Sequence, residues 1–246
     1  MGYRLGMRQT LKKFAVIRRL AYGLQLLRAK GQSNENEIVA RLAADAPKTF
    51  VEFGFHPAEF NCLPLARRSD WQGLLVDADP YMVADVGFFF SKRIRATTCF
   101  LTLDNLDLIR NTFDKLGVLS IDVDGNDYWF LKGLLDLHPA VICVEYNASF
   151  GLEPVTVPYD PLFDRHRKHP SGWYHGASIT ALAELAATAD YGLAAVSEAG
   201  VNAFFTKDGR LDPKEAWRPN RVRDQWSGST QAEQWQSVRE LPLESV

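Results

Sequence analysis

The sequence predicts an α/β fold, a doubly wound and mostly parallel seven-stranded sheet with helices on both faces. Short apolar runs alternate along the chain with stretches that are long enough for crossover helices. Within the runs the hydrophobic residues are continuous rather than alternating, which is typical of strands covered on both faces. With 246 residues, 46% of them hydrophobic, the chain is long enough for one large core, so we expect a single domain with extensions.

The expected parallel strands are five apolar runs, which span residues 49–55, 73–79, 96–103, 118–124 and 140–147. A further helix is expected to begin after Ser178, a residue that suits a helix N-cap. Two more runs, "GLAAVSE" and "VNAFFTK", are separated only by "AG". This spacing predicts a C-terminal β-hairpin that closes the sheet at its edge.

The chain divides into three regions. Residues 1–40 are expected to form a basic helical extension, residues 41–210 the α/β domain, and residues 211–246 a polar extension with a peripheral helix or two. Within the domain, residues 148–177 form a long connection, and connections of this length are usually functional or disordered. Its aromatic residues argue against disorder, so we expect a substrate loop. They include Tyr159, Phe163, Trp173 and Tyr174.

Charge is distributed unevenly along the chain. Eight of the 28 basic residues lie within residues 1–31, which contain no acid, so the remainder has 20 basic and 30 acidic residues. An acidic body of this kind does not indicate a nucleic-acid-binding protein. The basic N-terminal segment lacks the cleavage site of a signal peptide and the length of a membrane span.

The N-terminal segment is expected to contain an amphipathic helix. Its pattern places Phe14, Ile17, Ala21 and Leu24 on one helical face. We interpret this face as a surface that packs on the domain or on the partner in a homodimer. The alternative is peripheral contact with an anionic membrane surface, or with a phosphorylated or lipid-linked acceptor.

The three cysteines, Cys62, Cys99 and Cys143, are an odd number and lie far apart. Two of them, Cys99 and Cys143, fall within expected strands, which indicates buried thiols. They are interpreted as reduced residues of a cytoplasmic protein rather than as a disulfide framework or a metal site.

Polar residues terminate each of the five expected parallel strands. Parallel sheets bind ligands at the carboxyl ends of their strands, so these residues are the candidate site residues. Every one of the five ends carries an acid, which is more than solubility requires. In strand order the residues are Glu52 and Gly54, Asp77 and Asp79, Asp104 and Asn105, Asp122 and Asp124, and Glu145 and Asn147.

The turn after the first strand, "EFGFHPAEFN", has one glycine where a dinucleotide-binding fingerprint has three. It therefore favours a cofactor without phosphates that is held by side chains. Asp77, at the end of the second strand, is placed to bind a ribose diol. The alternative is that this acid caps the helix that Pro80 would begin.

Five motifs along the chain resemble the class I S-adenosylmethionine-dependent methyltransferases of the FkbM-type group. They are "VEFGF", "GLLVDADP", "FLTLDNLDLI", "LSIDVDGNDYWFLKGL" and "AVICVEYN". The pairing of "TLDNL" with "IDVDG" is the most specific part, and the resemblance spans about residues 49–207. It implies a Rossmann-like methyltransferase fold with S-adenosylmethionine as cofactor. One departure is the first turn, where His56 and Pro57 replace small residues.

The resemblance also implies which residues contact the cofactor. Those after the first strand would contact its methionine part, those after the second its ribose, and those after the third would lie near its adenine. The implied contacts are Glu52 and Gly54 for the methionine part, Asp77 for the ribose, and Asp104 or Asn105 for the adenine, and Phe55, Asn61 and Asp79 are further expected cofactor-binding residues.

In this architecture the fourth strand ends opposite the transferring methyl group, so Asp122 and Asp124 are the leading catalytic candidates. The motifs "IDVDGNDY" and "VEYN" also resemble metal-dependent small-molecule O-methyltransferases, which bind a divalent cation after the fourth and fifth strands. By position the ligands would be Asp122, Glu145 and Asn147, and oxygen ligands of this kind suit Mg²⁺ or Mn²⁺. In this chain Tyr146 separates the acid from the amide, which are adjacent in the metal enzymes.

A metal-free alternative uses a general base against the acceptor hydroxyl. His175, in "GWYHGAS", is the leading histidine for this role, and His56 is the second. Either histidine could instead be a loop residue that hydrogen-bonds the backbone. In "DGNDY", Asp127 could cap a helix, and Asn126 could belong to a turn.

Together these features predict a cytoplasmic S-adenosylmethionine-dependent O-methyltransferase. The acceptor is expected to be a small molecule or glycan with several hydroxyls. The FkbM-type resemblance implies a sugar from polysaccharide or lipooligosaccharide assembly, with a non-sugar secondary metabolite as the alternative. Two rival classes are a nucleotide-binding oxidoreductase, which the missing glycines disfavour, and an inactive scaffold that binds S-adenosylmethionine.

Overall fold

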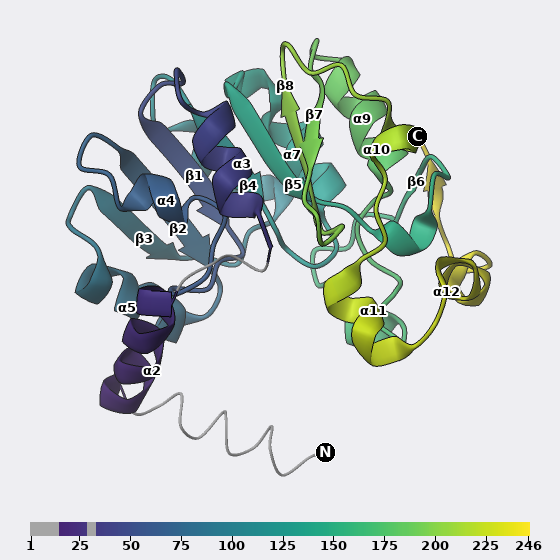
Figure 1. The fold of residues 1–246 in the computed structure, drawn as a ribbon, viewed down its shortest axis with the longest axis horizontal. Helices are drawn as coiled ribbons and strands as arrows, with labels where there is room; N and C mark the ends of the chain where they lie inside the picture. Colours follow the sequence, from purple (N-terminus) through teal and green to yellow (C-terminus); the bar gives the residue numbers. More distant parts are fainter. Residues whose placement is uncertain (1–14, 29–32) are drawn as a thin grey trace.

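A computed structural model describes residues 15–28 and 33–246, and a seven-stranded sheet with helices on both faces lies at its centre (Figure 1). The strands β1 to β5 are parallel, and β8 runs antiparallel to both of its neighbours, β5 and β7. Across the sheet the order is β3-β2-β1-β4-β5-β8-β7. The seven strands are β1 (Thr49–Phe53), β2 (Gln72–Asp77), β3 (Ile94–Thr98), β4 (Val118–Ile121), β5 (Val141–Glu145), β7 (Gly192–Val196) and β8 (Asn202–Thr206).

This topology confirms the predicted doubly wound fold and its closing hairpin. The hairpin strands β7 and β8 pair with each other, and β8 joins them to β5, so β7 forms the edge of the sheet. The strands are shorter than the apolar runs that predicted them, because the polar residues at the ends of the runs belong to turns. The order reverses at β1 and β4, where open α/β sheets leave a crevice for ligands.

Alternate residues of the central strands point to opposite faces, and each face buries a core of its own. Val51 and Ile142 point to the face covered by α7 and α9. Phe50 and Val118 point to the face covered by α3 and α4. Burial on both faces explains why these strands are continuously apolar in the sequence.

Most helices are preceded by Asp, Asn, Ser or Thr, the residue types that are favoured at a helix N-cap. Ser178 accepts a hydrogen bond from the backbone N–H of Ala181 at 3.0 Å, which confirms it as the N-cap of α9. The helices of the described chain are α2 (Ala15–Arg28), α3 (Glu35–Leu42), α4 (Leu63–Ala66), α5 (Pro80–Phe89), α6 (Asp107–Arg110), α7 (Asp127–Leu134), α8 (Arg165–Lys168), α9 (Ile179–Ala187), α10 (Pro213–Ala216), α11 (Arg221–Ser227) and α12 (Gln231–Val238). Short 3-10 turns are η1 (Leu103–Asn105), η2 (Leu135–Leu137) and η3 (Ala148–Phe150).

The connection 148–177 and the C-terminal extension form one packed unit. Strand β6 (Val155–Thr156) in the connection pairs with β9 (Glu244–Ser245) near the end of the extension. A third core, which includes Phe150, Tyr174 and Val238, lies between them. The extension therefore holds three short helices and a strand where the sequence predicted a peripheral helix or two, because its apolar residues are too dispersed to show a period.

Helix α2 corrects the prediction for the N-terminal segment. The helix forms, but Ile17, Ala21 and Leu24, expected to pack on the domain or on the partner in a homodimer, are exposed, so they do not pack on the domain. Arg18 and Tyr22 are buried instead, because Arg18 pairs with a buried carboxylate on α5. Phe14, the fourth member of the predicted face, lies outside the described residues.

All three cysteines are free thiols, and Cys62 and Cys143 are buried while Cys99 is half-buried. Burial raises the pKa of both buried thiols, which favours their protonated form. Within residues 15–28 and 33–246, no helix has both the length and the hydrophobicity needed to cross a bilayer.

Candidate functional site

The predicted site residues gather at the carboxyl ends of β1, β2, β4 and β5. Gly54 directly follows β1 and has a φ angle of +76°, a conformation that glycine adopts without steric cost. Its N–H donates to the carbonyl of Val76 at 3.1 Å, and the N–H of Asp122 donates to the carbonyl of Phe53 at 3.1 Å. A Cβ atom on Gly54 would lie 1.4 Å from the carbonyl oxygen of Asp122. The glycine therefore lets the ends of β1 and β4 approach each other closely.

Glu52 organises the turn that follows β1. This residue is 1% exposed, and its carboxylate oxygens accept hydrogen bonds from the backbone N–H groups of Asn61 and Cys62, each at 2.8 Å. Burial raises the pKa of Glu52, and the two N–H donors act against that rise. The carboxylate thus accepts hydrogen bonds from backbone N–H groups just before α4, which have no partner within the helix. Phe55 lies in the apolar core, with its ring 6.3 Å from that of Phe60.

The first of three cavities at this edge, cavity A, has a volume of about 220 Å³. It lies across the ends of β1, β2 and β4, and one wall comes from the turn after β3. Its lining includes Asp77, at the end of β2, and Asp122 and Asp124, which follow β4 on the other side of β1. Phe163, from the connection 148–177, covers part of it.

The two acids after β2 have different surroundings. Asp77 lines cavity A, and its Oδ1 accepts a hydrogen bond from the N–H of Asp79 at 2.7 Å. Asp79 caps α5, since its Oδ1 accepts from the N–H of Tyr81 at 2.8 Å. The structure therefore brings Asp77 to the cavity and places Asp79 at the start of the helix.

The residues predicted near an adenine lie just outside cavity A. Asn105 accepts a hydrogen bond from the N–H of Thr102 at 2.8 Å and donates to the carbonyl of Phe100 at 3.0 Å. Asp104 is exposed. The wall of the cavity here is formed by Cys99, Phe100 and Leu101, in the turn whose shape Asn105 maintains.

Cavity B is smaller, about 40 Å³, and is lined mainly by acceptors. It adjoins cavity A, because Gly54 and Asp122 line both. Three further acids line it, and no lysine or arginine of the described chain does so. They are Glu35, Glu52 and Glu59.

Two buried acceptors of cavity B have no hydrogen-bond partner among the described residues. They are Oε1 of Glu35, a residue 2% exposed, and Oδ1 of Asn202, a residue 3% exposed. Buried acceptors of this kind are costly unless a ligand or water donates to them. The other oxygen of Glu35 accepts from the N–H of Ser33 at 2.8 Å.

Sequence reasoning missed both residues. Glu35 lies in "GQSNENE", which has the composition of a linker, and it is the fold that returns this segment to the sheet. Asn202 begins β8 and lies directly opposite Glu145 in the strand register. A polar residue at the start of an otherwise apolar strand was the sequence feature that could have identified it as a site residue.

A cluster of carboxyl groups joins the ends of β4 and β5. Burial raises the pKa of Asp122 well above its usual range, and the neighbouring carboxylates of Asp127 and Asp124 raise it further. Burial likewise raises the pKa of Glu145 well above its usual range, with Asp122 as the next cause. Asp127 has its pKa raised to about 6 by burial, although its oxygens accept from the N–H groups of Val123 and Gly125.

Two arginines missed at the sequence level enter this cluster. Arg165, from α8, forms an ion pair with Asp124, which has a φ angle of +57° and an exposed side chain. The positive charge of Arg165 acts against the raised pKa values of Asp122 and Glu145. Arg223, from α11, also lies near Glu145. Both arginines are in regions whose fold the sequence does not predict.

His175 is buried, 2% exposed, behind the end of β5. Its Nε2 lies 3.9 Å from Oε1 of Glu145. Burial lowers its pKa well below the usual value, and the charges of Arg165 and Arg223 lower it further, which favours the neutral imidazole. His56, the second histidine candidate, packs edge-on against Tyr22, with ring centres 4.6 Å apart, and lines none of the three cavities at this site.

The three predicted metal ligands do not make a metal site. Asn147 is committed to the backbone, because its oxygen accepts from the N–H of Ser149 at 2.9 Å and its amide donates to the carbonyls of Trp173 and His175. Across the described parts of the chain, no group of three or more His, Cys, Asp or Glu side chains is arranged to hold a metal ion. The prediction of a metal at Asp122, Glu145 and Asn147 therefore finds no support in the geometry.

The connection 148–177 contributes an aromatic cavity, cavity C, of about 380 Å³. Tyr159, Phe163 and Tyr174 line it, and Phe163 lines cavity A as well. Lys168 lies at its rim and pairs with Asp160 at 2.6 Å. Three of the four predicted aromatic residues thus share a surface next to the acid cluster.

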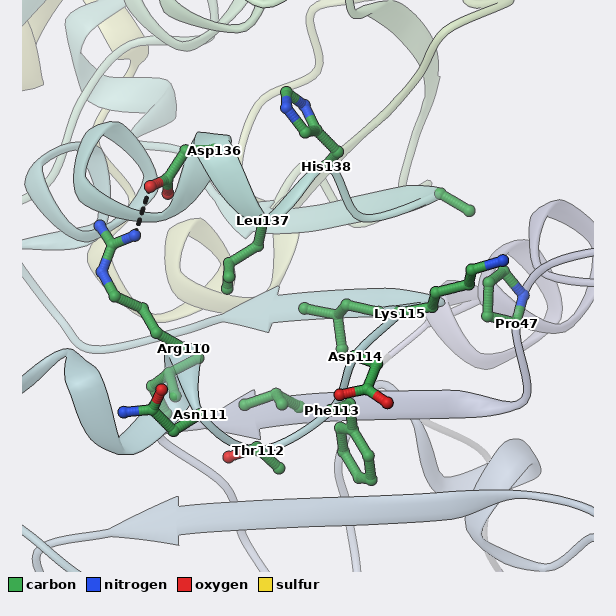
Figure 2. Close-up of a pocket in the computed structure, with 14 residues that line it drawn as sticks. Pro47, Arg110, Asn111, Thr112, Phe113, Asp114, Lys115, Asp136, Leu137 and His138 are labelled. Atoms are coloured by element: carbon green, nitrogen blue, oxygen red, sulfur yellow. Dashed lines mark hydrogen bonds and ion pairs between the residues drawn. The ribbon is translucent and has the colours of Figure 1, made fainter.

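A cavity of about 670 Å³, larger than cavities A, B and C, lies at the other end of the parallel strands, where they begin (Figure 2). It is close to the start of β4 and β5, and its wall includes His138 and the ion pair of Arg110 with Asp136. None of the sequence-predicted site residues lines it. Its place at the amino ends of the strands argues against it as the ligand site of an open α/β sheet.

No protein-family model and no curated protein matches the chain. Among solved structures, an O-methyltransferase from Bacillus cereus in complex with SAH is 18% identical, with a TM-score of 0.48 over 80% of this chain and 89% of that chain. Cofactor-bound Rv0187 from MTB is 16% identical, with a TM-score of 0.48 over 80% and 90%. The N-terminal domain of EvdMO1, in the presence of SAH and D-fucose, is 14% identical, with a TM-score of 0.46 over 72% and 82%. Because these structures are less than 20% identical to the chain, any proposal for its function has to rest on the geometry of the site.

Proposed function

We propose that the chain is an S-adenosylmethionine-dependent O-methyltransferase whose cofactor occupies cavities A and B. The observation that carries this proposal is that the two cavities meet at Gly54 and Asp122 and offer different chemistry at their far ends. Cavity A offers a carboxylate, Asp77, at the end of β2. Cavity B offers unpartnered acceptors on Glu35 and Asn202.

The hydrogen-bond acceptors that line the two cavities fit this cofactor. Asp77 can accept hydrogen bonds from both hydroxyls of a ribose, and the turn 99–101 can lie against an adenine. At the other end, an ammonium group needs acceptors only, which is what Glu35 Oε1 and Asn202 Oδ1 provide. A dinucleotide fits less well, because its pyrophosphate would meet the acids of cavity B and a turn with a single glycine.

The acid cluster suits a positively charged reacting group. S-adenosylmethionine, when bound, supplies an electrophilic methyl group on a positively charged sulfur. Asp122 lies where the two cavities meet, so its carboxylate is the group that would lie nearest to that charge. A cation there also offsets the repulsion among Asp122, Asp127 and Glu145.

Asp122 is proposed as the general base. Its raised pKa makes the ionised carboxylate a stronger base than that of an ordinary aspartate, so it accepts a proton from a hydroxyl more effectively. His175 is too deeply buried to reach an acceptor and contacts Glu145 instead, so it is assigned a positioning role. Since Asn147 is held by the backbone, no step of the proposal uses a metal ion.

The acceptor is proposed to be a sugar that occupies cavity C. The faces of Tyr159, Phe163 and Tyr174 suit the apolar face of a sugar ring, and Phe163 connects this cavity with cavity A. The FkbM-type resemblance of the sequence favours the same class of acceptor. A non-sugar metabolite with several hydroxyls is the alternative that an acceptor screen would distinguish.

Calorimetry with S-adenosylhomocysteine tests the proposal. We expect binding by the unmodified protein, and a Kd about 10- to 100-fold weaker for Asp77→Asn, because a hydrogen bond to a charged group contributes about 1.5–3 kcal/mol. Absence of binding by the unmodified protein would overturn the proposal. Binding of NADH in place of S-adenosylhomocysteine would identify an oxidoreductase.

A further inference from the structure

Helix α2 is attached to the domain by its polar side. Arg18 donates to both carboxylate oxygens of Asp85, which is fully buried on α5, and Arg19 donates to the same carboxylate at 2.9 Å. Tyr22 packs edge-on against His56, with ring centres 4.6 Å apart. These contacts determine which side of α2 faces the domain.

The opposite side of α2 is apolar and exposed. Its five large side chains recur at intervals that place them in one stripe along the helix, and each is between 50% and 86% exposed. The α2 stripe consists of Val16, Ile17, Leu20, Leu24 and Leu27. Phe88 of α5, 60% exposed, lies next to it, because the guanidinium of Arg19 is 4.7 Å from its ring centre. In Figure 1, α2 lies beside α5 at the periphery of the molecule.

A stripe of this size is typical of an interaction surface rather than of free solvent exposure. The charge of the surrounding segment indicates its partner. Residues 1–31 carry eight basic residues and no acid, and the rest of the chain is acidic. A symmetric contact between two copies would bring two such basic segments together. An anionic lipid surface compensates the charge and accepts the apolar stripe at the same time.

We propose that α2 docks on the surface of an anionic lipid bilayer through the α2 stripe. As described, α2 spans 14 residues, and no helix among the described residues is long and apolar enough to cross a bilayer. Docking would hold the carboxyl edge of the sheet near the lipid, since α2 contacts the turn after β1 through His56 and through a hydrogen bond from Gln25 to Glu59 at 3.3 Å. This proposal concerns membrane association alone and does not depend on the proposed methyltransferase activity.

Co-sedimentation with vesicles tests it. One set of vesicles contains phosphatidylcholine only, and the other contains phosphatidylcholine with phosphatidylglycerol. We expect the unmodified protein to bind the anionic vesicles, with binding that weakens as salt is added. We expect Leu20→Gln/Leu27→Gln to bind them about tenfold more weakly or worse, because polar side chains then face the acyl chains.

Leu211→Gln is the matched control, since Leu211 is also half-exposed but lies far from α2 in the chain, after the hairpin. It should bind like the unmodified protein. Circular dichroism verifies that all variants are folded, which is expected because the substituted leucines are exposed. Equal binding of both vesicle types, no binding to either, or full binding by the double variant would each overturn the proposal. A lipid-free dimer that the double variant converts to a monomer would show that the stripe is a subunit interface instead.

Discussion

Gly54 and Asp122 meet at the carboxyl ends of β1 and β4, so closely that the glycine has no room for a Cβ beside the carbonyl oxygen of Asp122. The two residues line both cavity A and cavity B. This contact therefore sets the distance between the first turn and the acid cluster. It also gives the physical reason for the one glycine in the turn after β1.

We expect Gly54→Ala to destabilise the protein by several kcal/mol, because the new methyl group would overlap the Asp122 backbone and the residue has a positive φ angle. Gly87→Ala is the matched control. Gly87 lies in α5 with open space around its Cβ position, so alanine there should stabilise the protein by about 0.5–1 kcal/mol. Urea unfolding measures both changes. A Gly54→Ala protein as stable as the parent would contradict the close approach.

Asp77 and Asp79 should separate ligand binding from stability. Asp77→Asn should weaken S-adenosylhomocysteine binding about 10-fold or more and leave the unfolding transition nearly unchanged. Asp79→Asn should do neither, because asparagine is also a good N-cap, whereas Asp79→Ala should cost about 1 kcal/mol of stability through loss of the α5 cap. The checks are calorimetry and thermal unfolding on the same samples. An affinity loss with Asp79→Ala as large as with Asp77→Asn would refute the separation.

Glu35 should recognise an ammonium group. Its unpartnered oxygen lines cavity B, so Glu35→Gln should weaken binding of S-adenosylhomocysteine about 10-fold. The same substitution should leave the affinity for adenosine unchanged, since adenosine carries the nucleoside but no ammonium group. Glu37→Gln, an exposed neighbour on α3, is the control. If Glu35→Gln weakened both ligands equally, the residue would act on the fold rather than on the ammonium group.

The pH dependence of activity should report the charge around Asp122. The ionised carboxylate is the proposed base, so kcat/KM should rise with pH above the range of an ordinary carboxyl group, and Asp122→Asn should lower kcat by about 10²–10⁴-fold. Asp124→Asn removes a neighbouring negative charge and should move the rising limb to lower pH. Arg165→Met removes a positive charge and should move it to higher pH. Shifts in the same direction would contradict the assignment of Asp122 as base.

Stability should change with pH in the opposite sense to activity. The pKa of Asp122 in the folded protein lies above its unfolded value, so its contribution to stability is present at low pH and is lost as pH rises through the folded pKa. Asp122→Asn removes that loss and should be more stable than the parent at pH 8, by about 0.5–2 kcal/mol, with a smaller difference near pH 4. Urea unfolding at the two pH values measures this. Asp208→Asn, an exposed acid, is the control.

The sheet could be predicted from the sequence because its strands are buried on both faces. Phe50 and Val51 are adjacent in the chain and belong to the cores on opposite faces of the sheet, so both are apolar. The strand can therefore be recognised from its own sequence, without knowledge of the strands that pair with it. The closing hairpin was visible because β8 is buried along most of its length and "AG" marks the turn between residues 197 and 201, although β7, at the edge of the sheet, alternates between buried and half-buried residues. Polar residues at the strand ends then located Asp77 and Asp122 at one edge.

Other parts of the site could not be predicted because they depend on tertiary contacts. Glu35 reaches cavity B from a polar segment, and Arg165 reaches the acid cluster from a four-residue helix, so neither belongs to a local pattern. Asn147 has the residue type and position of a metal ligand, but its side chain forms hydrogen bonds with backbone groups. The side of α2 that faces the domain could not be predicted, because the ion pair of Arg18 with one buried carboxylate, Asp85, outweighs the apolar period of the helix.

The small sheet formed by β6 and β9 has a consequence for how the protein is made. Strand β6 precedes its partner β9 by a stretch that includes α9, the hairpin and all of the C-terminal helices. On the ribosome, the central sheet and cavities A and B can assemble while β9 is still inside the exit tunnel. The wall of cavity C is completed only afterwards, when Leu241 and Pro242 arrive. A nascent chain would therefore form cavities A and B before it completes cavity C.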